Sequence, residues 1–260
     1  MAVEISNVNE LQAINNDPTA DYVLVNNIDA SATAGWNSGA GFLPIGGFEF
    51  ETGFSGELDG NGFVVTGLYV DTATAEAGLV GWQRSGGHVR NLGVENCDIT
   101  GSGRAGAVVS YNNDGSIDYC WSTGSVSGAE EVGGLCGRNH TNRTITNSFS
   151  HCSVTAITAR VGGFVGNIGS GASLVHCYST GAVGGTATLQ GGLAGRVSST
   201  PGPITACFWD TQTSGQATSA GGTGKTTAEM QQEATFTNWD FDHVWSIDEG
   251  NDYPKLRISR

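Results

Sequence analysis

The strongest constraint on the fold of this chain is a short glycine-bounded motif that returns about every 28 residues. The motif starts at five glycines spaced 28, 28, 29 and 29 residues apart: Gly78, Gly106, Gly134, Gly163 and Gly192. It reads Gly78-Leu79-Val80-Gly81 in the first unit and Gly163-Phe164-Val165-Gly166 in the fourth. A fixed period of this length predicts a repeat architecture, in which each unit buries its apolar residues against its neighbours.

Each unit repeats further positions at constant distances from the glycine motif. The first column is apolar: Val89, Ile117, Ile145, Leu174 and Ile204. Three residues later come Leu92, Cys120, Ser148, Cys177 and Cys207. An aromatic column follows, with Gly93 in the first unit: Trp121, Phe149, Tyr178 and Phe208. A last apolar column closes the units: Ile99, Val126, Val154 and Val183.

Three short β-prone stretches per unit predict an all-β fold, a right-handed parallel β-helix with three faces. Equivalent stretches of successive coils would pair in parallel about 4.8 Å apart, so that like residues stack on like. A helical repeat would need long stretches of 3.6-residue periodicity, which the units lack. A propeller blade would need four longer strands, usually in about 40 residues or more. The high glycine content, 41 of 260 residues, fits a chain that turns a corner many times.

The ends of the chain depart from the repeat and predict caps on one continuous domain. Residues 1–45 are expected to form an N-terminal cap and the first coil, with a short helix from Val8 to Asn16 capped by Asn7. Residues 46–210 hold the repeated coils. Residues 211–260 form an irregular C-terminal capping segment with a short helix, Thr226 to Ala234, and aromatic residues expected to cover the last coil: Trp239, Phe241 and Trp245.

Two neighbouring columns of the glycine motif are both apolar, which leaves their orientation open. Leu79, Leu135, Phe164 and Leu193 form one of them, and Val80, Val108, Cys136, Val165 and Ala194 form the next. Adjacent residues of a regular strand face opposite ways. Either a corner lets both columns be covered, or one column forms an exposed apolar stripe for a partner.

Together these residues resemble the GLUG-repeat family, which takes its name from the Gly-Leu-x-Gly-like anchor. Phe54–Gly62 is similar to the entry coil of that family, and Trp209-Asp210 through Tyr253–Leu256 is similar to its usual tail. The second coil departs from the pattern at Val109, where Gly is expected. The resemblance implies a β-helical module of a large bacterial or archaeal surface protein, of a kind also found beside IgA-peptidase-type domains. It implies no catalytic residues.

The cysteines and the glycine-rich loop give no cofactor or metal site. Cys120, Cys177 and Cys207 share one column, where parallel side chains point alike, so we expect buried thiols rather than disulfides. No Cys/His spacing is typical of zinc. Gly221–Thr227 mimics a phosphate loop but has Ser219 where that motif needs Gly. The many acidic residues make calcium binding possible, although the sequence contains no calcium-binding motif. We therefore predict no cofactor and no metal ligands.

The negative net charge of the chain restricts the kinds of partner that it can bind. The net charge is −14 and the only lysines are Lys225 and Lys255, which argues against nucleic acid and against an anionic membrane surface. No apolar run reaches transmembrane length, so no membrane insertion is expected. We expect a secreted or cell-surface fragment of a larger prokaryotic protein, lacking its signal peptide here, with a glycan or another surface protein as partner.

The residues favour a non-enzymatic module that serves adhesion, surface recognition or spacing. The candidate binding residues are the four aromatic residues of one column: Trp121, Phe149, Tyr178 and Phe208. Because Cys and aromatic columns are adjacent, an inward Cys column would place the rings outside, where they could stack on sugars; an inward aromatic column would leave only a scaffold. The alternative is a polysaccharide lyase or hydrolase, which would need acids and an Arg or Lys base on one face. The arginines Arg84, Arg104, Arg138, Arg143 and Arg160 are expected near corners without convergent acids, so no catalytic residue is assigned.

Overall fold

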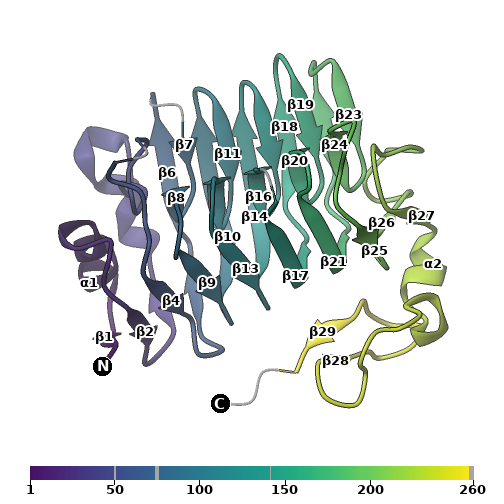
Figure 1. The fold of residues 1–260 in the computed structure, drawn as a ribbon, viewed down its shortest axis with the longest axis horizontal. Coiled ribbons are helices and arrows are strands. Elements are labelled where there is room, and N and C mark those ends of the chain that lie inside the picture. Colours follow the sequence, from purple (N-terminus) through teal and green to yellow (C-terminus); the bar gives the residue numbers. More distant parts are fainter. Residues whose placement is uncertain (50, 74–75, 141, 258–260) are drawn as a thin grey trace.

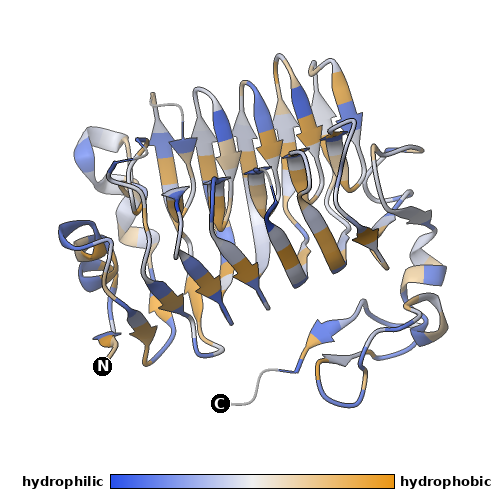
Figure 2. Ribbon diagram, in the orientation of Figure 1, coloured by the Kyte–Doolittle hydropathy of each residue, from blue (hydrophilic) through white to orange (hydrophobic). Residues whose placement is uncertain are grey.

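A computed structural model describes residues 1–260 except 50, 74–75, 141 and 258–260. Its described residues are mostly short strands stacked in parallel coils, which confirms the predicted β-helix (Figure 1). Apolar bands repeat from strand to strand along the stack (Figure 2). The buried side chains inside the coils form one continuous core.

The strands of the coils belong to three parallel sheets, here called A, B and C. Sheet C contains β7 (Glu76–Ala77), β11 (Arg104–Gly106), β15 (Glu131–Gly133), β19 (Arg160–Gly162) and β23 (Leu189–Gly191). Sheet B contains β8 (Val80–Gln83), β12 (Val109–Asn112), β16 (Cys136–Asn139), β20 (Val165–Ile168) and β24 (Ala194–Val197). Sheet A contains β1 (Val3–Ile5), β2 (Tyr22–Leu24), β3 (Ile28–Asp29), β4 (Glu57–Asp59), β5 (Val64–Thr66), β6 (Tyr69–Thr72), β9 (His88–Arg90), β10 (Gly93–Gly101), β13 (Ser116–Asp118), β14 (Trp121–Gly128), β17 (Thr144–Ser150), β18 (Ser153–Ala156), β21 (Ser173–Ser179), β22 (Val183–Gly185), β25 (Ile204–Thr205), β26 (Phe208–Asp210) and β27 (Thr223–Lys225).

The repeated columns of sheet A lie in register, as the sequence predicts. Ile117 pairs with Val89 and Ile145, and Leu174 pairs with Ile145 and Ile204. The aromatic column stacks in the same way from Trp121 to Phe208. The last apolar column continues from Ile99 to Val183. Equivalent side chains therefore stack along one axis, and the two apolar columns fill the core inside the coils.

The register of the glycine motif is offset by one residue in the second coil. Gly106 pairs with Gly133 rather than lying level with Gly134, and Val109 pairs with Val80 and Cys136. Val109 is therefore the residue level with Val80 and Cys136, and the assignment of Val108 to that column was wrong. Ser110 follows Val109 and occupies the position of the expected second glycine.

The corner between sheets C and B explains why both apolar columns of the motif are buried. Leu79, Leu135, Phe164 and Leu193 lie in the bend between the two strands, and the next residue in each coil opens the strand of sheet B. Both columns are fully buried. The interpretation as a covered corner is confirmed, and the exposed stripe is wrong.

A left-handed backbone position recurs at a second corner, inside sheet A between the Val89 and Leu92 columns. The residues there have φ values between 43° and 52°: Asn91, Tyr119, Asn147, His176 and Ala206. Asn tolerates this conformation because its short side chain can bond locally, whereas other non-glycine residues are strained by about 1 kcal/mol or more. The last coil therefore holds a strained residue, Ala206.

Replacing Ala206 with glycine is expected to raise the free energy of unfolding by about 1 kcal/mol, because glycine adopts φ near 48° without strain. Chemical denaturation of the whole chain measures the change. The control is Ala159→Gly, at a position without a positive φ, which should lose up to about 1 kcal/mol. A loss of stability in Ala206→Gly would show that strain is not the dominant effect at this corner.

The N-terminal cap has the predicted helix. It consists of α1 (Val8–Ala13) followed by a 3₁₀ turn, η1 (Ile14–Asn16), and the Asn7 side chain accepts hydrogen bonds from the backbone N–H groups of Asn9 and Glu10. Val8, Leu11 and Ile14 are buried against the first coil. Two further 3₁₀ turns follow, η2 (Ser31–Gly35) and η3 (Asn37–Gly39).

The C-terminal segment takes a different course from the one expected. Residues 211–224 close the last coil, where Ala220 donates a backbone hydrogen bond to Ala194 and β27 pairs with β26. The chain then forms α2 (Thr227–Met230), N-capped by Thr226, and the 3₁₀ turn η4 (Glu233–Thr235). An antiparallel pair, β28 (Trp245–Ser246) and β29 (Lys255–Leu256), runs back beside the coils (Figure 1). Trp239 contacts Phe208 and Ala206 of the last coil, as expected, and Trp245 extends the cover to Phe149 and Tyr178 of the preceding coils.

Candidate functional site

The aromatic column lies on the outer face of sheet A but is not exposed to solvent. Alternation along the strands places the cysteine column in the core, with Cys120 and Cys177 fully buried, and the rings on the opposite face. Trp121 and Phe149 stack with ring centroids 6.4 Å apart, and Phe149 and Tyr178 with centroids 5.1 Å apart. The exposed fractions of the four side chains are only 8% for Trp121, 6% for Phe149, 0% for Tyr178 and 6% for Phe208. We call these four residues the aromatic ladder.

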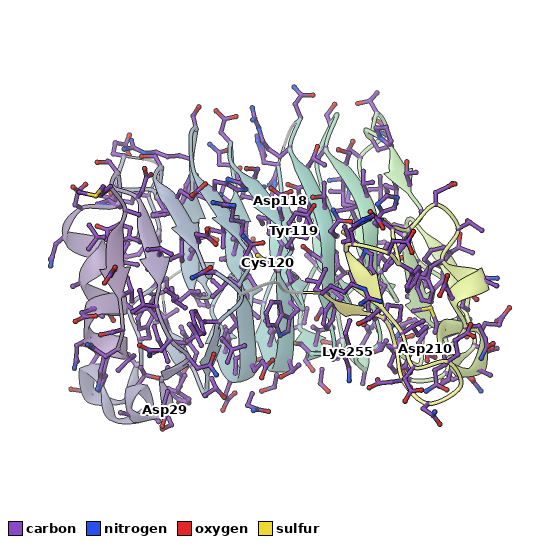
Figure 3. All side chains as sticks on the ribbon, turned by 90° about the horizontal axis from the view of Figure 1, so that it is seen from below. Asp29, Asp118, Tyr119, Cys120, Asp210 and Lys255 are labelled. Atoms are coloured by element: carbon purple, nitrogen blue, oxygen red, sulfur yellow. The ribbon has the colours of Figure 1, made fainter. Side chains whose placement is uncertain are left out.

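The C-terminal segment covers the aromatic ladder and forms a second apolar cluster with it. The buried residues that the segment contributes are Met230, Phe236, Trp239 and Trp245. The Tyr178 hydroxyl donates to the Pro254 carbonyl oxygen at 2.6 Å, and Trp239 Nε1 donates to the Ala206 carbonyl oxygen at 2.9 Å. Figure 3 shows this segment crossing the side of the solenoid, with Lys255 and Asp210 labelled near it. The ladder is thus outward with respect to the coils and internal with respect to the whole chain.

The ladder ends at Trp121, because the preceding coil has Gly93 in this position. The indole of Trp121 lies over Gly93 and occupies the space of the missing side chain. Its Nε1 donates to Glu95 Oε1 at 2.8 Å. At this end the C-terminal segment leaves a cavity of about 290 Å³ lined by Glu95, Trp121, Thr123, Phe149, His151, Lys255 and Leu256. Of the four candidate binding residues, Trp121 and Phe149 line this cavity, whereas Tyr178 and Phe208 do not.

The polar groups that line the cavity differ in charge and in their hydrogen-bond partners. Burial lowers the pKa of His151 to about 4, so this ring is neutral at neutral pH. His151 contacts the Thr180 hydroxyl through Nδ1 and the Tyr178 hydroxyl through Nε2, which fixes its orientation. Lys255 is exposed at the mouth and pairs with Asp252, whose pKa it lowers. The cavity therefore combines two aromatic rings with a carboxylate, a hydroxyl, a neutral imidazole and an ammonium group. Sequence reasoning found the rings but missed the polar groups, two of which come from the tail and from the end of β17.

The six cysteines are free and buried, as expected for thiols that fill the core. Burial raises the pKa of Cys136 to about 12 and raises the pKa of Cys120 still further. Neither thiol therefore forms a reactive thiolate at neutral pH.

Charged residues cluster on the outer face of β4, β9 and β13, which the sequence did not predict. His88 lies between Asp118, 2.7 Å from its Nε2, and Glu57, 3.3 Å from its Nδ1. Arg90 pairs with Glu57 and with Asp59 at 2.9 Å. The hydrogen bond to Asp118 raises the pKa of His88. Asp59 is thus one member of an ion-pair network.

In the part of the chain that the structure covers, no three side chains of His, Cys, Asp or Glu are arranged to hold a metal ion. In the same residues no helix has the length and apolar character needed to cross a membrane.

Comparison with known proteins gives relatives that are much longer than this chain. No family model matches the sequence. A halomucin of Haloquadratum walsbyi is 38% identical over 152 residues, which is 56% of this chain and 2% of that protein. A "putative Gly-rich membrane protein" of Evansella cellulosilytica is 29% identical over an alignment that covers 90% of this chain and 41% of that protein.

A solved structure shares the fold. It is a "putative immunoglobulin A1 protease" from Bacteroides ovatus, with a TM-score of 0.68 and 16% identity over 100% of this chain and 93% of that one. At this identity the likeness concerns the fold alone. The chain is therefore a β-solenoid that is similar in sequence to part of a halomucin and to part of a protein named as a membrane protein.

Proposed function

We propose that this chain is a non-enzymatic recognition module of a larger cell-surface protein, and that the cavity beside Trp121 holds a sugar ring. The names of the two relatives and the small share of their length that the chain matches support the surface assignment. The Gly-Leu-x-Gly-like anchor supports a place among GLUG-repeat modules. The stacked coils would present the cavity on a rigid scaffold.

The observation that carries the proposal is the lining of the cavity. The apolar face of a sugar packs on aromatic rings, while its hydroxyls need several donors and acceptors. Trp121 and Phe149 supply rings, and Glu95, Thr123 and Lys255 supply polar groups. A volume of about 290 Å³ lies at the lower end of small-molecule sites, which favours one sugar unit over a long oligosaccharide.

A glycan array tests this proposal with the wild-type chain and two variants. Trp121→Ala should weaken the binding of any retained glycan about tenfold or more, because aromatic packing contributes about 1.5 kcal/mol beyond the buried area. Glu95→Gln keeps an acceptor for Trp121 Nε1 but removes the charge, so its fold should remain while its affinity falls. The control is Trp36→Ala, which removes a partly buried indole in the N-terminal cap.

The outcomes separate the candidate functions. Retention of no glycan by the wild-type chain would contradict recognition at this cavity and leave a spacer. Release of reducing or unsaturated ends from a polysaccharide would instead favour the enzyme alternative. Equal losses in Trp121→Ala and Trp36→Ala would mean that the effect comes from stability and not from the cavity.

A further inference from the structure

The outer surface where sheets B and C meet gathers four arginines in a chain of net charge −14. The outward column of sheet C alternates in charge: Glu76, Arg104, Glu131 and Arg160. The neighbouring column of sheet B contains Trp82, Tyr111, Arg138, Asn167 and Arg196. We call Arg104, Arg138, Arg160 and Arg196 the arginine surface. The expectation that the arginines lack convergent acids was wrong.

Two buried glutamates lie under the arginine surface. Glu131 is 2% exposed and accepts hydrogen bonds from Arg104 Nε at 2.8 Å, from Asn167 Nδ2 at 2.7 Å and from Arg160. Arg138 Nη1 lies 3.6 Å from the same carboxylate. These cations lower the pKa of Glu131 despite its burial.

The second glutamate, Glu76, is 1% exposed. It pairs with Arg104 at 2.6 Å and accepts from the Ser110 hydroxyl at 2.7 Å. Arg104 is therefore shared between the two carboxylates and neutralised by them. Arg138 and Arg160 have only part of the charge of Glu131 to balance them.

The charges of this region do not cancel. Four guanidinium groups lie in a region with two buried carboxylates, which leaves an excess of positive charge. The exposed Glu130 on the adjoining turn reduces this excess by one charge but does not remove it. No carboxylate of the described residues forms an ion pair with Arg196, which is exposed. The Nε groups of Arg138 and Arg160 also have no acceptor in the described structure. The pKa of nearby His140 is lowered mainly by burial and, second, by the charge of Arg138. This effect of Arg138 is a second sign of a local positive potential.

We propose that the arginine surface binds an acidic polysaccharide through its carboxylate or sulfate groups. Arg138 and Arg196 lie in one column two coils apart, so their backbone positions are spaced by about 10 Å along the solenoid axis. A linear polymer that carries anions at regular intervals matches this arrangement. Oxyanions also match the forked donors of arginine better than any neutral group does.

Two features favour a polysaccharide over nucleic acid. Protein–DNA complexes commonly neutralise about 6–10 phosphates, whereas only Arg138, Arg160 and Arg196 are available here. The same column of sheet B begins with the half-buried Trp82, which contacts Tyr111 edge-on with ring centroids 4.3 Å apart. These two rings offer an apolar surface to a sugar. At physiological salt the acidic remainder of the chain is screened beyond about 8 Å, so the local charge decides binding.

Titration calorimetry of the whole chain with four probes tests the proposal. The probes are polygalacturonate, dextran sulfate, neutral dextran and a single-stranded DNA oligonucleotide. We expect binding to at least one acidic polysaccharide, none to neutral dextran, and weaker binding to the DNA. Arg196→Gln should weaken polysaccharide binding about tenfold, since a charge-assisted contact contributes about 1.5 kcal/mol, and should reduce the slope of log K against log salt by about one.

Matched variants make the result interpretable. Arg84→Gln removes the same charge from a surface arginine of the first coil, outside the arginine surface, and should change affinity less than twofold. Trp121→Ala should leave polyanion binding unchanged, which separates this site from the proposed sugar cavity. The proposal is overturned by the absence of binding to both acidic polysaccharides, by equal losses in Arg196→Gln and Arg84→Gln, or by tighter binding of the DNA.

Discussion

Replacing Gly162 with alanine is expected to lower the free energy of unfolding by about 3 kcal/mol or more. A Cβ atom on Gly162 would lie 2.2 Å from the Val165 carbonyl oxygen, 2.7 Å from the Gly195 backbone nitrogen and 2.8 Å from the Ala194 Cα atom. All three are backbone atoms of the tight turn into sheet B or of the next coil, so no side-chain rotation relieves the contact. The same position is glycine in three further coils, where an added Cβ would meet the carbonyl oxygen three residues later in the same way: Gly106, Gly133 and Gly191. The repeat therefore requires glycine because two backbones approach each other there.

Chemical denaturation of Gly162→Ala beside Gly184→Ala measures this effect. Gly184 lies in β22 with open space around its Cα and without a positive φ, so alanine there should be neutral or should stabilise by up to about 1 kcal/mol. A loss of less than about 1 kcal/mol in Gly162→Ala, or an equal loss in both variants, would mean that the glycine serves chain flexibility and not the close approach.

The columns of the coils could be predicted because parallel in-register stacking repeats the same residue type at the same place. The offset in the second coil could not, since Gly106-Ala107-Val108-Val109 offers two valines that fit the motif equally well. Only the pairing of Val109 with Val80 and Cys136 decides between them. A register error of one residue assigns each side chain to the neighbouring column, and at this corner burial cannot reveal the error because Val108 and Val109 are both buried.

The candidate sites, too, could be predicted only where they follow from the repeat. The outward direction of the aromatic ladder follows from alternation with the cysteine column, but its burial depends on the path of a tail without repeats. The charged column of sheet C did have a sequence signal. The residue two places before the aligned glycine is Glu76, Arg104, Glu131 and Arg160 in successive coils. The register error at Gly106 hid this alternation, because Arg104 and Glu131 become equivalent only when Gly106 is aligned with Gly133.

Replacing Trp245 with alanine is expected to release the C-terminal segment from the coils. Trp245 is fully buried, 4.3 Å from Trp239 and 6.2 Å from both Phe149 and Tyr178 between ring centroids. Loss of such a side chain costs about 3–5 kcal/mol. Its contacts join the segment to the outer face of sheet A rather than to the core inside the coils. The cost should therefore fall on the attachment of the segment.

Limited proteolysis measures that attachment. A loss of 3 kcal/mol or more raises the open population of the segment roughly 100-fold, and cleavage after Lys225, where the last coil ends, should accelerate by a similar factor while the coils stay intact. The freed aromatic ladder should then bind an apolar dye. Phe48→Ala, at a side chain that is 51% exposed in the N-terminal part of the chain, should change neither readout. Digestion of the coils together with the segment would contradict this account, because it would mean that the second apolar cluster is needed for the coils to fold at all.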